Sequence, residues 1–135
     1  MRRLLPAADA EEWQGAPPGT AVGHIHLHVG SLDSGEAFYH RALGFDKAAW
    51  NYPGALFMSA GGYHHHLGIN VWAPGPSPAP DEAQLLEWSL VVPTSEDVAS
   101  AAASLRAAGY EPEHGPDGLL AADPWGTRVR VRANE

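Results

Sequence analysis

Two short clusters of histidines are the part of this 135-residue sequence best suited to chemistry. They hold six of the eight histidines, namely His24, His26, His28, His64, His65 and His66. Neutral imidazole is the commonest metal ligand in proteins, and it also acts as a general acid or base near neutral pH. The chain has no cysteine, which excludes thiolate zinc sites, cysteine nucleophiles and disulfides. The clusters therefore indicate an imidazole metal site, an acid–base site, or both.

The first cluster lies in a segment that alternates strictly between polar and apolar residues. Residues 22–29 have the period of a half-buried β-strand, so His24, His26 and His28 should share one face. His24 is the expected metal ligand of this strand. His26 and His28 are expected to line a substrate pocket on the same face, with solvated histidines on an open sheet as the alternative.

The second cluster precedes another apolar run, and residues 63–72 are expected to form a strand. Alternation would place His64 and His66 on one face with Asn70, and His65 on the other face. This favours His66 as a ligand. His64, Asn70 and Trp72 are further candidates for pocket lining, and each histidine could instead be hydrogen-bonded within the strand.

An internal repeat with an offset of about 63 positions organises the chain, since His24 aligns with Glu87 and Arg41–Phe45 aligns with Arg106–Tyr110. Each copy predicts a βαβββ module. Expected strands are 22–29, 46–51, 55–60, 63–72, 86–92, 109–113, 118–122 and 127–132, with helices at 35–43 and 95–108. Expected boundaries are an arm at 1–20 and a domain at 21–135, divided into module one (21–72), a proline-rich linker (73–84) and module two (85–132).

Several motifs resemble the vicinal-oxygen-chelate superfamily of glyoxalases, bleomycin resistance proteins and extradiol dioxygenases. Gly23–Val29 followed by Ala37–Phe45 is similar to the opening of its modules, and Asp123–Arg128 is similar to their closing turn. Gly61–Trp72 resembles the later half of two-part bacterial catechol 2,3-dioxygenases. The resemblance covers residues 22–132. It implies an α+β fold in which two tandem βαβββ modules form a cupped, mixed, eight-stranded sheet with the helices outside.

The resemblance also implies a site at the centre of the cup. Family ligand positions fall on His24, His66, Glu87 and Arg130 of this sequence. Two histidines and one carboxylate suit Fe(II) or Mn(II), and the same ligand types would also accept Ni(II) or Zn(II). Arg130 cannot be a ligand because it has no lone pair to give, but it could bind an anionic or enolate oxygen of a substrate. His65 matches the family's acid–base histidine.

These expectations leave three readings open. The first is a metal-dependent enzyme, of the dioxygenase or lyase type, acting on an oxygen-rich or catechol-like substrate that chelates the metal. The second is a metal-free sequestering protein of the bleomycin-resistance kind, in which Glu87 and Arg130 form an ion pair in an emptied metal site. The third is a non-catalytic dioxygenase-like subunit, which would expose an apolar patch where further modules pack.

The composition of the chain limits the kinds of partner that it is expected to bind. The formal net charge of −8 argues against nucleic acid, and no segment approaches the length of a membrane span. The basic start of the chain lacks the apolar run of a signal peptide, so a cytoplasmic location is expected. A small-molecule ligand is the expected partner. A homodimer is also expected, because small cupped sheets have edges that need cover.

Overall fold

The two-module organisation is visible in the order of the elements. The computed structural model describes residues 14–49, 51–73, 79 and 81–134. The elements are β1 (Ile25–His28), α1 (Leu32–Gly35), η1 (Glu36–Ala42), β2 (Asp46–Ala49), β3 (Ala55–Ser59), β4 (Leu67–Asn70), β5 (Glu87–Val92), α2 (Ser95–Ala107), β6 (Glu113–Gly115), β7 (Gly118–Ala122) and β8 (Arg128–Ala133). The order strand, helix, three strands occurs twice, which confirms the predicted α+β class.

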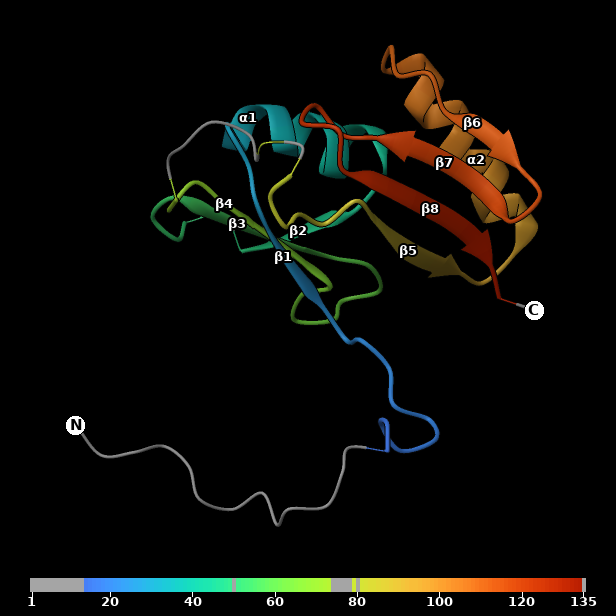
Figure 1. The fold of residues 1–135 in the computed structure, drawn as a ribbon. Helices are drawn as coiled ribbons and strands as arrows, with labels where there is room; N and C mark the ends of the chain where they lie inside the picture. The colour runs from blue at the N-terminus through green and yellow to red at the C-terminus, as the bar shows by residue number, and fades with distance from the viewer. Residues whose placement is uncertain (1–13, 50, 74–78, 80, 135) are drawn as a thin grey trace.

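The described strands form two four-stranded sheets. Their orders are β1-β4-β3-β2 and β5-β8-β7-β6, and in each sheet the first two strands are parallel while the others are antiparallel. The expected single eight-stranded sheet is therefore replaced by two sheets side by side (Figure 1). The physical reason is that side chains, rather than a backbone ladder among the described strands, hold the two modules together.

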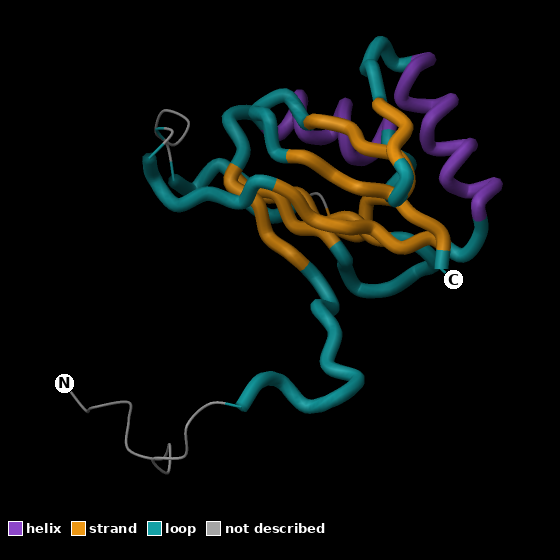
Figure 2. The backbone as a smooth tube through the Cα atoms, turned by 45° about the vertical axis from the view of Figure 1, so that its right-hand side comes forward, coloured by secondary structure: helices purple, strands orange, loops and turns teal. Residues whose placement is uncertain are grey.

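One apolar core joins both modules beneath the helices. The helices gather on one side of the two sheets, as the tube in Figure 2 shows. Phe38 of η1 meets Tyr110 of the second module at a ring-centroid distance of 4.9 Å. The largest fully buried side chains are Tyr39, Phe38, Met58, Leu67, Ile69, Leu105, Leu119, Val129 and Val131. In β1 and β8 the apolar residues turn toward this core, so their polar neighbours lie on the opposite, open faces.

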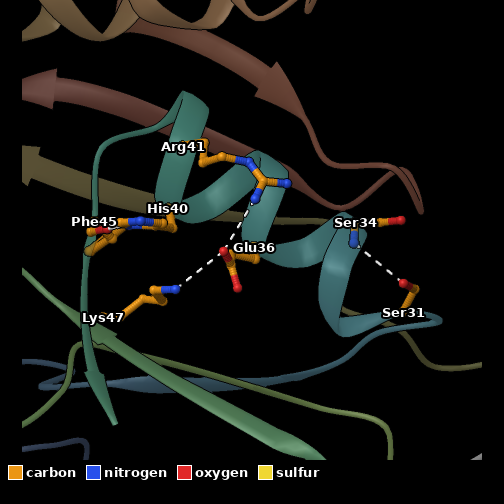
Figure 3. A network of polar contacts seen from close by, with 7 residues as sticks. All are labelled: Ser31, Ser34, Glu36, His40, Arg41, Phe45 and Lys47. Carbon is orange, nitrogen blue, oxygen red and sulfur yellow. Dashed lines mark hydrogen bonds and ion pairs between the residues drawn. The ribbon is translucent and has the colours of Figure 1, made fainter. Parts of the chain in front are cut away.

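The first helix begins earlier than predicted because Ser31 caps it. Its side chain accepts a hydrogen bond from the Ser34 N–H at 3.3 Å, as Figure 3 shows. The helix then widens into the π-helical segment η1. In the same view Glu36 lies between two cations, with its Oε1 at 3.2 Å from Arg41 Nη1 and 3.3 Å from Lys47 Nζ. The second ion pair connects η1 to β2.

Helix α2 follows the sequence expectation closely. Thr94 and Asp97 form a capping box, in which each side chain bonds the other residue's backbone N–H. Two strands differ more from expectation. Strand β4 begins only at Leu67, because residues 61–66 form an irregular turn in which Gly61 and Gly62 have φ of 64° and 75°. Strand β6 lies at 113–115 rather than 109–113.

A buried hydrogen bond ties the two modules. The Tyr39 hydroxyl donates to Asp123 Oδ2 at 2.6 Å, while Asp123 Oδ1 accepts the N–H groups of Trp125 and Thr127, both at 2.9 Å. The Trp125 ring in turn lies against Gly30, where an added Cβ would meet its Nε1 at 2.6 Å. Burial, with the Asp123 charge behind it, raises the pKa of Tyr39 far above its ordinary value.

The predicted arm and linker lie partly outside the described residues. Residues 1–13 of the arm and residues 74–78 and 80 of the linker belong to that part of the chain. Residues 14–24 are exposed and form neither helix nor strand. In the part of the chain that the structure describes, every helix is too short or too polar to cross a membrane.

Candidate functional site

Three histidines meet on the open face of the first sheet. The possible ligand atoms of His24, His26 and His65 all lie within 4.8 Å of one another. The Nε2 atoms of His26 and His65 are 3.1 Å apart, and the rings of His24 and His65 are 4.6 Å apart. His24 and His26 are exposed and His65 is half-buried, so a ligand can reach the group from solvent.

The donor set fits a divalent metal ion. Imidazole nitrogens bind Zn(II) at about 2.0–2.1 Å, so two nitrogens on one ion are at most about 4.2 Å apart. The nitrogens of the group already approach that limit, and small rotations of exposed side chains can close the rest. An imidazole set suits Fe, Ni and Zn. It lacks the carboxylate that would add a preference for Mn(II).

His65 reaches this face because strand β4 begins only after it. Alternation along a continuous strand would have turned His65 toward the core, but β4 starts at Leu67 and the preceding residues are irregular. His66 instead continues the pairing through its backbone. Its carbonyl accepts the Ile25 N–H at 3.0 Å, and its Nδ1 accepts the Ala60 N–H at 3.2 Å.

The pKa of His65 is lowered. Burial is the largest cause, and the neighbouring imidazoles, led by His64 and His24, lower it further because each would repel a second positive charge. A lowered pKa favours the neutral ring. The neutral ring has a free nitrogen lone pair, which metal coordination and proton acceptance both require.

An aromatic surface borders the histidines. The Phe57 ring lies 5.7 Å from the His26 ring and 5.1 Å from the His65 ring. Tyr52 contacts Phe57 at 6.0 Å and Trp72 at 5.9 Å, so a run of rings leads away from the histidine group. Tyr52 and Trp72 are each more than half exposed. This surface can receive a planar apolar ligand beside the group.

Gly68 makes room for this arrangement. It pairs with His26 across the parallel ladder, and an added Cβ would meet the His26 ring at 2.9 Å. The imidazole therefore lies over the glycine. Gly68, Phe57 and Tyr52 are not among the site residues predicted from the sequence. Phe57 and Gly68 are register partners in the ladder between β3 and β4, and this pairing could not be read from the sequence alone.

Glu87 and Arg130 form a separate feature on the second sheet. Arg130 Nε donates to Glu87 Oε1 at 2.7 Å, and Arg130 Nη2 donates to Oε2 at 3.2 Å. Arg128 Nε lies 3.6 Å from the same carboxylate. The Arg130 hydrogen bond is the main cause that lowers the pKa of Glu87. Both Glu87 oxygens are therefore engaged by cations.

Of the remaining predicted site residues, only some lie near the histidine group. Within the described part of the chain, the structure brings His24 together with His26 and His65, and it groups neither His66 nor Glu87 with them. His64 contacts the His65 ring at 4.6 Å. The predicted pocket residues His28, Asn70 and Trp72 lie on or just beyond the same strands. Asn70 is buried, with Oδ1 accepting the Trp72 N–H at 3.3 Å, and Trp72 Nε1 donates to the Pro53 carbonyl.

Comparisons with known proteins agree with this architecture. The family model described as the glyoxalase/bleomycin resistance protein/dioxygenase superfamily matches residues 21–131. The chain is 42% identical over 125 residues to a catechol-2,3-dioxygenase of Bacillus subtilis (strain 168). That match covers 90% of this chain but 44% of the relative, so the chain spans less than half of the relative's length.

Solved structures share the fold at low identity. The lactoylglutathione lyase of Agrobacterium tumefaciens superposes with a TM-score of 0.61 at 18% identity, covering 87% of this chain and 96% of that one. A glyoxalase/bleomycin resistance protein/dioxygenase from Alicyclobacillus acidocaldarius gives a TM-score of 0.59 at 12% identity, covering 84% and 90% of the two chains. At such identities these likenesses concern the fold alone.

Proposed function

The chain belongs to the glyoxalase/bleomycin resistance protein/dioxygenase superfamily, and from this premise we propose that it is a metal-dependent enzyme acting on a small catechol-like substrate. The observation that carries the proposal is the meeting of His24, His26 and His65 beside an aromatic surface. The 42% identity to a catechol-2,3-dioxygenase supports the substrate class.

In the proposed site the three imidazoles would hold a divalent ion, with Fe(II) as the first candidate and Zn(II) and Ni(II) as others. Such an ion would supply Lewis acidity to two neighbouring oxygens of a substrate. The chain's own residues would orient the substrate. Phe57 would contact the face or edge of its ring, and Tyr52 and Trp72 would extend that contact.

His65 has two alternative roles in this site. It is a third ligand, or it is the acid–base group that takes a proton from a substrate hydroxyl, and its lowered pKa suits either role. We favour the ligand role because its Nε2 lies beside that of His26. The ligand set expected from the resemblance, His24, His66 and Glu87, is less favoured because Glu87 already binds two arginines.

The test begins with metal content. Protein purified without oxygen and reconstituted with Fe(II) would be analysed by elemental mass spectrometry, and oxygen uptake would be followed with catechol. We expect about one iron per chain, lost in His24→Ala, and catechol-dependent oxygen uptake. The matched control for iron content is His28→Ala, which removes an exposed imidazole from the same face of β1 and should keep its iron. If wild type binds none of Fe(II), Ni(II) and Zn(II), the proposal fails.

The variant His65→Ala separates the two roles of His65. Loss of iron together with activity supports the ligand role. Retention of iron with loss of oxygen uptake supports the acid–base role. If the variant keeps the iron content and the activity of wild type, His65 is not part of the site.

A second candidate function is a metal-free protein that binds and sequesters a small molecule. The bidentate ion pair between Glu87 and Arg130 favours it, because such a pair would fill a metal site that has lost its ligands. In this case wild type and His24→Ala would bind an aromatic ligand with equal affinity. Titration by tryptophan fluorescence, with exposed Trp72 as reporter, would detect that binding.

A homodimer is also part of the proposal. Strands β1 and β2 are the edges of the first sheet, and β5 and β6 are the edges of the second. Edge strands present unpaired backbone groups that a second copy can cover. Light scattering coupled to size-exclusion chromatography would give the mass of the particle, and a mass of one chain would contradict this part.

A further inference from the structure

The open face of the second sheet carries a row of arginines. Arg128, Arg130 and Arg132 alternate along β8 with Val129 and Val131, which are fully buried. The three side chains therefore project from the face that the helices do not cover, and their Cα atoms are about 6.6–6.8 Å apart along the strand. The whole chain has 8 basic residues and a net charge of −8, so this row is a local concentration of positive charge.

The contact with Glu87 fixes Arg130 while leaving part of it free. Glu87 takes the edge of the guanidinium formed by Nε and Nη2. A guanidinium has five N–H donors, so one Nη1 hydrogen and one Nη2 hydrogen remain on the adjacent edge. That edge has the fork geometry that binds a carboxylate or phosphate with two parallel hydrogen bonds. The side chain is held in place, with only 23% of its surface exposed.

Arg128 adds charge beside this fork. Its Nε lies 3.6 Å from Glu87, which is an ion pair but too long for a hydrogen bond, and its side chain is 50% exposed. One carboxylate is thus shared by two cations. Ser89 is the register partner of Arg130 on β5, and it places a hydroxyl on the same face. The three residues can supply donors to one compact anion.

Acidic neighbours limit the size of that anion. Glu113 is the partner of Leu120, which is in turn the partner of Arg130, so Glu113 lies two strands away, at about 9–10 Å. Asp117, in the turn before β7, also acts electrostatically on Arg130. The positive charge of this face is therefore confined to β8. A single anionic group fits this surface, whereas a polyanion would meet repulsion.

We propose that Arg128 and Arg130, with Ser89, form a binding site for the oxyanion group of a small molecule, a carboxylate or a phosphate. Glu87 is the positioning residue of this site, because it orients the Arg130 fork and partly neutralises its charge. The inference does not depend on the metal or on the reaction proposed above. It adds a recognition site on the second sheet to the histidine group on the first.

Isothermal titration of the purified protein tests this site. Benzoate and inorganic phosphate are the two probes, and the tighter of the two identifies the chemistry of the anion. We expect Arg130→Gln to weaken that probe by about tenfold, as loss of one or more charge-assisted hydrogen bonds implies. Arg106→Gln is the matched control, since it removes one exposed positive charge from helix α2. A change of less than about twofold is expected there.

Two further variants keep the result interpretable. Glu87→Gln leaves every arginine in place and keeps an amide oxygen that can accept from Arg130 Nε, so the fork stays oriented while the competing negative charge is removed. It should therefore bind the probe several-fold more tightly. His24→Ala should bind it as wild type does, because a probe held by a metal would be released in that variant. Circular dichroism would check that each variant is folded. Equal weakening by Arg130→Gln and Arg106→Gln, or no binding of either probe, would overturn the proposal.

Discussion

The Tyr39 hydroxyl and Asp123 Oδ2 are 2.6 Å apart although the residues are 84 positions apart in the chain. Tyr39 belongs to the π-helical segment of the first module, and Asp123 opens the last turn of the second. Both side chains are buried. Since the two sheets are not joined by a ladder among the described strands, this bond is one of the contacts that fixes one module against the other.

Replacing Tyr39 with Phe should destabilise the protein by about 2 kcal/mol. The change keeps the ring and removes the donor, leaving a buried carboxylate oxygen without its partner. Urea unfolding followed by circular dichroism would measure the loss. Tyr110→Phe is the control, because its hydroxyl has no described partner, and it should change the stability by less than about 0.5 kcal/mol. Equal stability of the two variants would contradict the role of the bond.

The same bond predicts a loss of stability at alkaline pH. The pKa of Tyr39 is raised in the folded protein, whereas an unfolded tyrosine titrates near pH 10. Its contribution is therefore complete below about pH 10 and falls above it, by about 1.4 kcal/mol for each pH unit. The stability advantage of wild type over Tyr39→Phe should shrink as the pH rises from about 9 to about 11. An advantage that stays constant with pH would argue against this shift.

Much of the fold was predictable because it follows from local patterns. Alternation located β1, and the helix expected at 95–108 is found as α2 at Ser95–Ala107. The internal repeat predicted the two modules. The single sheet was not correct, because whether two module edges join by hydrogen bonds or by side chains depends on long-range packing. The Tyr39–Asp123 bond carries no local sequence signal.

The histidine group shows where alternation stops being informative. Residues 63–72 were expected to form one strand, which would have sent His65 and His66 to opposite faces. The turn at Gly61 and Gly62 delays β4 to Leu67, so the ring of His65 joins His26 instead. A glycine pair signals a turn but does not indicate how many residues that turn contains. The two histidine clusters were visible in the sequence, but the orientation of His65 was not.

Glu87 should make the protein sensitive to acid. Its pKa is lowered in the folded state, chiefly by the hydrogen bond from Arg130, from an ordinary value of 4.5. A lowered pKa gives stability that is present above that value and is lost as the pH falls through the folded pKa. The stability difference between wild type and Glu87→Gln should therefore shrink below about pH 4.5.

Urea unfolding at a series of acidic pH values would follow this difference. Glu111→Gln is the control, because Glu111 is exposed and has no described partner. Its stability should follow that of wild type throughout the series. If Glu87→Gln and Glu111→Gln respond to acid in the same way, the ion pair does not contribute to stability.

Gly68→Ala should weaken metal binding while leaving the fold intact. The added Cβ would lie 2.9 Å from His26 Cε1 and 3.0 Å from His26 Nδ1, so the ring must move away. The ring belongs to an exposed side chain, so moving it costs little stability, but it shifts one of the three proposed ligands. Displacing a ligand's support typically costs about 10–100-fold in metal affinity. We therefore expect about a tenfold loss for Zn(II), measured by competition with a chromogenic chelator.

Gly23→Ala is the matched control for this substitution. Gly23 precedes His24, and an added Cβ there meets no atom within 4 Å. This variant should bind Zn(II) as wild type does, and both variants should unfold at the same urea concentration as wild type. If Gly68→Ala binds Zn(II) as tightly as Gly23→Ala, then His26 is not a ligand. The ion would then depend on His24 and His65 with a donor other than His26.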